Sequence, residues 1–187
     1  MLFREKGFTL IELMITIALL AVLLFIAVPN FSGFVASSRL AASKELLISS
    51  ISLARSEAIK RGDRVAVCRT TDGATCAGTS QTAGNADWSE GWLVFLDADD
   101  DQTVDADELI KVYADIADSV SVQYTRGDVF VYEGIGLLDL ATTDDETFTI
   151  SDSGDADIGM AIFLRPTGRI RMCQEWQAST AACADNN

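Results

Sequence analysis

Histidine is missing from this 187-residue sequence altogether. Histidine is the most frequent general base near neutral pH and the commonest metal ligand. Its absence argues against a zinc enzyme, a Ser-His-Asp hydrolase and a Cys-His protease. No other nucleophile–base pair stands out in the sequence, so we expect no catalytic residues and no enzymatic activity.

Basic residues are also scarce: 14 lysines and arginines face 28 aspartates and glutamates, and the formal net charge is −14. A strongly acidic protein repels nucleic acid and anionic lipid at long range. Binding to either partner would therefore need a local basic patch.

Only four cysteines occur, and they form two close pairs in the sequence, Cys68 with Cys76 and Cys173 with Cys183. Four cysteines allow three connectivities, and proximity favours the two local pairings. Neither pair has the Cys-x-x-Cys spacing of a redox or metal motif. We therefore expect structural disulfides, each stabilising by about 2–3 kcal/mol, in an exported domain.

The sequence does contain one long apolar run, residues 8–28, which is interrupted by Glu12. About 21 helical residues cover about 31 Å, the thickness of a bilayer core. Arg4 and Lys6 precede the run, which predicts a cytoplasmic N-terminus and an exported body. A secretory signal peptide would be shorter and would end in a small-x-small cleavage site. A simple membrane anchor leaves Glu12 unexplained, because a carboxylate in hydrocarbon costs about 2.5 kcal/mol or more.

Residues 7–13, GFTLIEL, resemble the cleavage motif of type IV prepilins and of type II secretion pseudopilins. The resemblance implies cleavage between Gly7 and Phe8 by a prepilin peptidase, followed by N-methylation of Phe8. It also implies that Glu12 pairs with the amino terminus of a neighbouring subunit during assembly. Two opposite charges neutralise each other where neither would be stable alone.

The helix should continue beyond the apolar run. Pro29 and Gly33 are expected to kink or locally melt it. An amphipathic stripe then predicts packing on a globular head; its members are Leu40, Leu47, Ile51, Ala54 and Ala58. Lys60, Arg61 and Gly62 form a plausible helix end.

These signals divide the chain into four parts: a leader (1–7), a transmembrane or filament-core half-helix (8–29), an amphipathic half-helix (30–61) and a β-rich head (62–187). In the head the apolar pattern changes to period two. The predicted strands are 64–69, 91–96, 108–113, 119–124, 129–132, 147–150, 160–164 and 169–173. The expected fold class is α+β, with the long helix packed on antiparallel sheet.

Residues 88–97, WSEGWLVFLD, with the acidic stretch and DELI that follow, resemble the FimT/FimU minor pilins and the related GspH pseudopilins. That resemblance implies a pilin fold in which the long helix packs on two facing β-sheets. It implies major and minor pilins as partners, an inner-membrane precursor with a periplasmic head, and later a place in the pilus at the cell surface. Trp88 and Trp92 are expected to pack in the core.

An acidic stretch at residues 97–108 has the spacing of a calcium-binding EF-hand loop. Gln102 stands at the sixth place, where the sharp turn calls for glycine, and the stretch lies between two predicted strands instead of two helices. The alternative interpretation is a solvated acidic turn. The candidate calcium ligands are Asp97, Asp99, Asp101, Asp105 and Glu108.

The segment Gly168-Arg169-Ile170-Arg171 is the candidate nucleic-acid site. Strand alternation would place Arg169 and Arg171 on one face and Ile170 inward, with Arg165 extending the patch. Paired guanidinium groups hold successive phosphates well. The segment also resembles the GRxR signature of FimT-type minor pilins, which implies binding of double-stranded DNA for natural transformation.

Two functions remain open at this point. In the first, the chain is a minor pilin that binds double-stranded DNA without sequence preference, because phosphate contacts read no sequence. In the second, it is a structural minor pilin or GspH-like pseudopilin, which primes filament assembly for twitching or type II secretion without binding DNA.

Overall fold

The computed structural model describes residues 8–81, 84–105, 107–114, 116–139, 146–154, 159–173, 176–177 and 182–183; at residues 24, 26–32, 176–177 and 182–183 it describes the backbone alone. Gly7 and the rest of the predicted leader lie outside the described residues. The chain divides into two compact units, Met1–Ser38 and Arg39–Asn187, which we describe separately.

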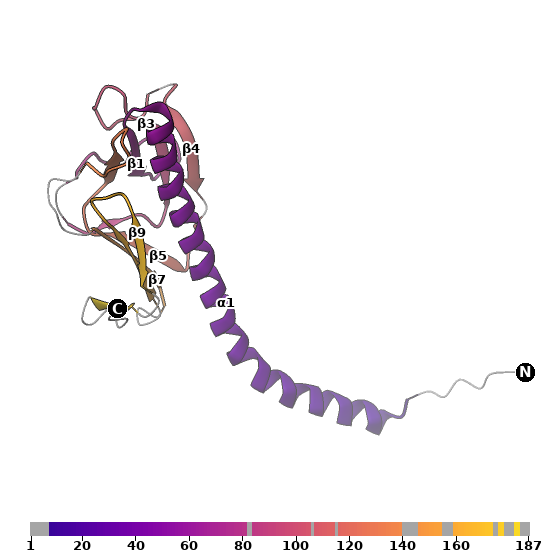
Figure 1. Cartoon of the computed structure of the whole chain (residues 1–187). Helices are drawn as coiled ribbons and strands as arrows, with labels where there is room; N and C mark the ends of the chain where they lie inside the picture. Colours follow the sequence, from indigo (N-terminus) through magenta and orange to yellow (C-terminus); the bar gives the residue numbers. More distant parts are fainter. Residues whose placement is uncertain are drawn as a thin grey trace, which may run out of the picture. The chain divides into compact units, whose positions relative to one another are not determined.

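One helix, α1 (Leu10–Arg61), begins in the first unit and ends in the second (Figure 1). Thr9 and Glu12 form a capping box at its start: the Thr9 N–H donates to Glu12 Oε2 at 2.9 Å, and the Glu12 N–H donates to Thr9 Oγ1 at 3.3 Å. The backbone stays helical through Pro29 and Gly33, so the local melting expected there does not occur. A proline removes one helix hydrogen bond, and the neighbouring turns continue without it.

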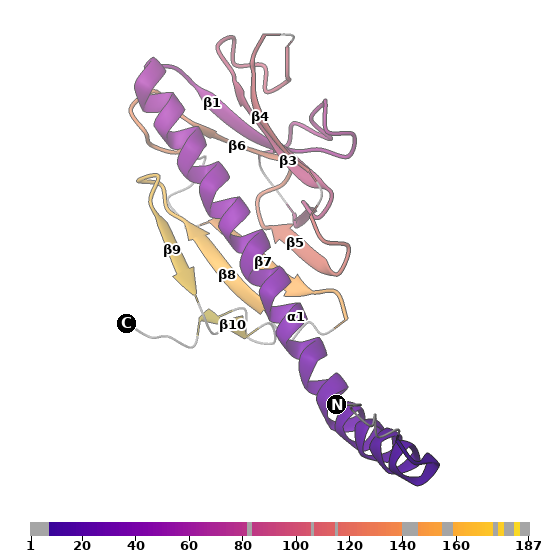
Figure 2. The same cartoon turned by 90° about the vertical axis from the view of Figure 1, so that its right-hand side faces the viewer.

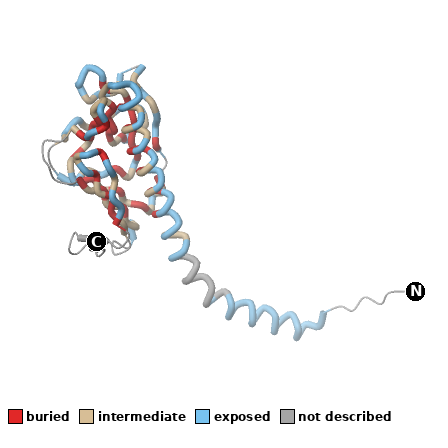
Figure 3. Tube along the Cα trace, viewed as in Figure 1, coloured by how far each residue is buried: buried red, intermediate tan, exposed pale blue. Residues whose placement is uncertain are grey.

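Residues of the first unit are exposed along the described helix, as the pale stretch of Figure 3 shows, and many of them are apolar. They include Leu10 at 76% and Leu23 at 66% exposure; Phe8, which precedes the helix, is 87% exposed. Within the described part of the chain, no helix has both the length and the apolar character needed to cross a membrane. The membrane-spanning role of residues 8–29 stays a prediction.

In the second unit, all five residues of the predicted stripe are buried: Leu40, Leu47, Ile51, Ala54 and Ala58. The helix ends as predicted at Arg61, and Gly62 follows with φ 68°, in the left-handed region. The N–H of Gly62 donates to the Ala58 carbonyl at 2.8 Å, which satisfies one carbonyl of the last turn.

Antiparallel strands form the rest of the second unit. The described strands are β1 (Val65–Arg69), β2 (Ala86–Asp87), β3 (Gly91–Leu96), β4 (Leu109–Ala114), β5 (Val120–Tyr124), β6 (Val129–Tyr132), β7 (Glu146–Asp152), β8 (Gly159–Leu164), β9 (Ile170–Cys173), β10 (Trp176–Gln177) and β11 (Ala182–Cys183). One sheet has the order β4-β3-β1-β6 and another the order β2-β5-β7-β8-β9, while β10 and β11 pair with each other. Figure 2 shows α1 running across both larger sheets. The predicted α+β arrangement, a long helix packed on two antiparallel sheets, is thereby confirmed.

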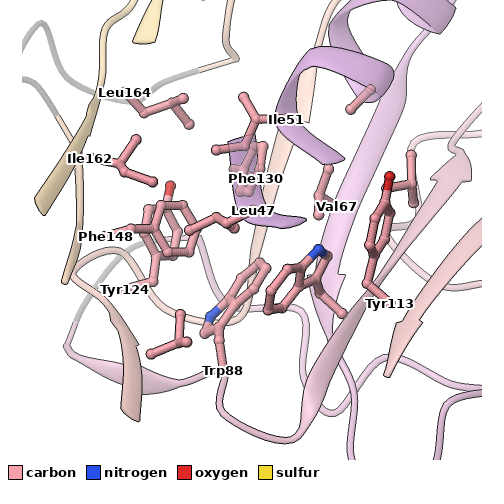
Figure 4. Close-up of a cluster of buried hydrophobic side chains, with 14 of the residues drawn as sticks. Leu47, Ile51, Val67, Trp88, Tyr113, Tyr124, Phe130, Phe148, Ile162 and Leu164 are labelled. Atoms are coloured by element: carbon pink, nitrogen blue, oxygen red, sulfur yellow. The ribbon is translucent and has the colours of Figure 1, made fainter. Parts of the chain in front are cut away.

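Aromatic side chains fill the space between the helix and the sheets (Figure 4). Trp88 is fully buried among Tyr124, Phe130 and Phe148, with ring centroids 5.2–5.9 Å apart. Its Nε1 donates to the Gly127 carbonyl at 3.0 Å, which satisfies the one polar atom of the side chain. Trp88 and Trp92 therefore belong to the core, as predicted.

Cys68 and Cys76 form a disulfide, as predicted from their proximity. It closes a short loop at the end of β1. Cys173 is disulfide-bonded as well. The side chain of Cys183 lies outside the described residues, so the second pairing stays a prediction.

Candidate functional site

The candidate nucleic-acid site is the arginine turn, which we define as residues 165–171. It comprises the connection between β8 and β9 (165–169) and the first two residues of β9. The Arg165 N–H donates to the Arg169 carbonyl at 2.9 Å, and the Gly168 N–H donates to the Arg165 carbonyl at 2.7 Å. Among the described strands, β9 pairs with β8 alone and lies at the edge of the five-stranded sheet. The turn thus joins the two outermost strands on this side of the described sheet.

Arg169 and Arg171 are both exposed, and Ile170 packs against the core. This agrees with the predicted inward direction of Ile170. The Arg171 guanidinium lies over the Phe163 ring, 4.9 Å from its centroid, across the β8–β9 pair. Arg169 precedes the first residue of β9 and is therefore held by the turn instead of the strand.

Positive charge is locally concentrated here, although the whole chain is acidic. Residues 159–173 contain Arg165, Arg169 and Arg171 and no carboxylate. Among the described residues, no carboxylate forms an ion pair with Arg169 or Arg171.

Arg55 of α1 is a contributor that the sequence analysis missed. Its Nε donates to the Gly136 carbonyl at 3.1 Å and its Nη2 to the Thr167 carbonyl at 3.2 Å. Arg55 thus holds the turn in place. Both acceptors are uncharged carbonyls, so these hydrogen bonds do not neutralise the positive charge of Arg55. A groove of about 590 Å³ lies beside it, lined by Ile51, Ser52, Arg55, Ser56, Ile59, Tyr132, Gly168, Arg169 and Ile170.

Gly168 holds the turn in a conformation that other residues adopt poorly, because its φ is 72°. A Cβ atom at this position would lie 2.2 Å from the Gly136 carbonyl oxygen and 2.9 Å from the Tyr132 ring. The turn is therefore packed closely against the segment that follows β6. A rigid support of this kind reduces the entropy lost when arginines engage a ligand.

Gly168→Ala should destabilise the head by about 2 kcal/mol, because both the left-handed backbone and the close approach to Gly136 oppose a side chain. Chemical unfolding followed by tryptophan fluorescence measures this. Gly154→Ala is the matched control, since Gly154 has an ordinary φ and the atom nearest to an added Cβ, Asp152 Oδ1, is 3.2 Å away. Equal losses for the two variants would contradict the special role of Gly168.

The acidic stretch forms the connection between β3 and β4, in the other large sheet. It brings one carboxylate oxygen each from Asp97, Asp99 and Asp101 to within 4.8 Å of one another. Asp105 and Glu108 do not belong to this group; the Glu108 Oε2 accepts the Asp105 N–H at 3.1 Å. Three of the five predicted calcium ligands are therefore brought together.

The leader and assembly residues lie in the first unit. Gly7 is outside the described residues, and Phe8 is exposed. Glu12 lies in the first turn of α1, where it forms the capping box with Thr9. The spacing T-x-x-E of Thr9 and Glu12 is the sequence signature of a capping box and could have predicted this helix start.

Comparison with known proteins identifies the family. Residues 45–182 match the family described as Type II transport protein GspH. Residues 2–28 match the prokaryotic N-terminal methylation motif. This motif marks pilin-like proteins that a prepilin peptidase processes and that associate with other pilins, so the family is one of filament subunits and not of enzymes.

The fold is similar to the crystal structure of the type IV minor pilin FimU of Pseudomonas aeruginosa (strain PAO1). The TM-score is 0.53 at 18% identity, and the match covers 74% of this chain and 91% of that chain. A second crystal form of FimU matches with a TM-score of 0.49 at 18% identity, covering 71% of this chain and 90% of that one. The match along residues 45–182 and the methylation motif show that this chain belongs to the GspH family, as a minor pilin or pseudopilin with the α+β pilin fold.

Proposed function

We propose that this chain is a minor pilin of a type IV pilus that binds double-stranded DNA through the arginine turn. The observation that carries the proposal is the group of three arginines on a rigid turn without any carboxylate in residues 159–173. Arg169 and Arg171 would contact successive phosphates, with Arg165 beside them. Arg55 would add to the local positive potential.

The precursor would sit in the inner membrane through residues 8–29, with its head in the periplasm. Cleavage after Gly7 and methylation of Phe8 would prepare it for the filament. Glu12 would then neutralise the new amino terminus of a neighbouring subunit inside the filament. DNA captured on the exposed pilus would be taken up in natural transformation.

The net charge of −14 favours a second candidate, a structural minor pilin or pseudopilin that primes assembly without DNA. Long-range repulsion lowers the rate at which DNA approaches an acidic protein. The two candidates therefore differ in one property, the affinity of the arginine turn for a duplex. Because only a few phosphates would be contacted, the expected Kd is on the order of 10–100 µM.

Arg171→Gln and Arg169→Gln should each weaken DNA binding by about 1–2 kcal/mol, roughly five- to thirtyfold, because each removes a charge-assisted contact with phosphate. Fluorescence anisotropy of a labelled duplex of arbitrary sequence, with the full chain in non-ionic detergent, measures the Kd. Arg61→Gln is the matched control. It removes the same charge from an arginine that pairs with Glu57 at 2.8 Å at the end of α1.

Loss of affinity in the turn variants with unchanged affinity in the control would support DNA binding at the turn. Absence of binding by the unaltered chain would favour the structural role. Equal losses in all three variants would point to general charge attraction, and the arginine turn would then lose its assigned role.

A further inference from the structure

The acidic stretch at residues 97–108 has twelve residues in the register of a calcium-binding loop. Carboxylates occupy the first, third, fifth, ninth and twelfth positions; they are Asp97, Asp99, Asp101, Asp105 and Glu108. Such loops take ligands from these positions and from the backbone carbonyl at position seven, here Thr103. Within the loop, Gln102 at position six departs from the glycine found there in EF-hands; outside it, the flanking elements are strands instead of helices.

Gln102 nevertheless has the backbone conformation that glycine supplies at this position. Its φ is 60°, in the left-handed region that non-glycine residues seldom adopt. Its N–H donates to Asp97 Oδ1 at 3.0 Å, which folds the loop back over its first residue. The loop thus keeps the required turn despite the substitution.

Within the described part of the chain, Asp97 has a buried carboxylate oxygen without a hydrogen bond, which indicates that a ligand binds here. The residue is completely buried, with 0% exposure. Its Oδ1 accepts the Gln102 N–H, but its Oδ2 accepts no hydrogen bond among the described residues. A buried carboxylate oxygen without a hydrogen bond is costly, and such atoms are few in folded proteins. The same side chain lies in the group of three carboxylates within 4.8 Å of one another.

The neighbouring cation, Arg64, does not satisfy that oxygen. Its Nε is 3.9 Å from Asp97 Oδ2, beyond hydrogen-bonding distance, while its Nη2 lies 2.7 Å from both Asp100 and Asp139. Arg64 is thus engaged by carboxylates outside the ligand positions.

We propose that residues 97–108 bind one calcium ion, with Asp97, Asp99 and Asp101 as its initial ligands. Calcium takes six to eight oxygen ligands in a flexible arrangement, which a loop of this kind provides. The Thr103 carbonyl and Asp105, directly or through water, would complete one side. Glu108 would bind the ion from the opposite side. Its Oε2 now accepts a hydrogen bond from the Asp105 N–H, and this bond would break when Glu108 turns to the ion.

The ion would fix the connection between β3 and β4 to the start of β1. The Asp97 N–H donates to the Arg64 carbonyl at 3.0 Å, so the first ligand is already tied to the residue that precedes β1. Calcium would therefore act as a structural ligand of the head. The binding site is independent of the arginine turn, which lies in the other large sheet.

Isothermal titration of the chelator-treated full chain with calcium chloride, in non-ionic detergent, tests the proposal. We expect one saturable site with a Kd on the order of 0.1–1 mM, the range of extracellular calcium modules. Asp99→Asn should weaken binding at least about tenfold, since it removes a charged ligand. Asp99 is exposed, so its replacement should leave the fold intact.

Asp107→Asn is the matched control. It removes the same charge from the same loop at position eleven, which supplies no ligand, and Asp107 is also exposed. Unchanged binding in this variant beside the loss in Asp99→Asn would support the site. Two results would overturn it: absence of saturable binding up to calcium concentrations on the order of 10 mM, or equal weakening by both substitutions, which would mean diffuse attraction to an acidic surface.

Discussion

Replacing Glu12 by glutamine should exclude the chain from filaments as completely as replacing it by alanine should. Glutamine can still accept the Thr9 N–H and so preserve the capping box, whose loss costs about 1 kcal/mol. It cannot perform the role proposed for Glu12, which is to neutralise the amino terminus of a neighbouring subunit. Leaving one buried charge without its partner costs about 3–5 kcal/mol, which lowers incorporation by more than about a hundredfold.

The measurement is the amount of the chain in filaments sheared from cells, compared with the amount in the membrane fraction. Glu45→Gln is the control, because Glu45 is an exposed helix carboxylate whose side chain is 69% accessible and pairs with Lys44. Normal incorporation of Glu12→Gln beside failure of Glu12→Ala would show that Glu12 acts only as a helix cap.

The head should lose stability as the pH rises from about 5 to about 8, because of Glu146. This side chain is 3% exposed, and burial raises its pKa to about 7. Tyr124 donates a hydrogen bond to its Oε2, and the Arg126 Nε lies 3.8 Å from its Oε1. In the unfolded chain the same carboxyl group ionises near pH 4.3.

Between these two values the folded state holds a proton that the unfolded state has released, so unfolding becomes easier as the pH rises. The contribution is complete below about pH 4 and is lost by about pH 8, and it amounts to roughly 4 kcal/mol. Glu146→Gln retains an acceptor for Tyr124 and removes the titration. The difference in unfolding free energy between the unaltered chain and this variant should therefore change with pH by about that amount.

Chemical unfolding followed by tryptophan fluorescence at several pH values gives this difference directly. Glu90→Gln, which alters an exposed carboxylate, serves as the control and should follow the profile of the unaltered chain. A profile of Glu146→Gln parallel to that of the unaltered chain would mean that Glu146 is ionised in the folded head throughout this range.

Much of the fold was predictable because its signals are local. The bounds of β3 and β6 agree with the predicted strands at 91–96 and 129–132. The apolar residues from Leu40 to Ala58 recur with the 3.6-residue period of a helix, so the buried face of α1 could be predicted from the sequence. By contrast, β2, β10 and β11 have two residues each, which is too short for an alternating pattern.

The site was less predictable because it depends on contacts between distant segments. The GRxR pattern identifies the arginine turn, but no local signal shows that Arg55 bonds to the Gly136 and Thr167 carbonyls. Likewise, the acidic spacing suggests calcium, whereas the unsatisfied Oδ2 of Asp97 becomes visible only in the folded head. In the sequence, Glu146 looks like an ordinary polar residue at the start of a strand. Its burial arises only in the folded head, where β7 lies between β5 and β8.

The salt dependence of DNA binding tests the proposed role of the arginine turn most directly. The anisotropy titration is repeated at several salt concentrations, and the logarithm of the association constant is plotted against the logarithm of salt concentration. Each phosphate contact contributes about −0.9 to the slope, so the double variant Arg169→Gln/Arg171→Gln should have a slope smaller by about two, and Arg61→Gln an unchanged one. Identical slopes for the unaltered chain and the double variant would contradict the proposal that these arginines hold DNA.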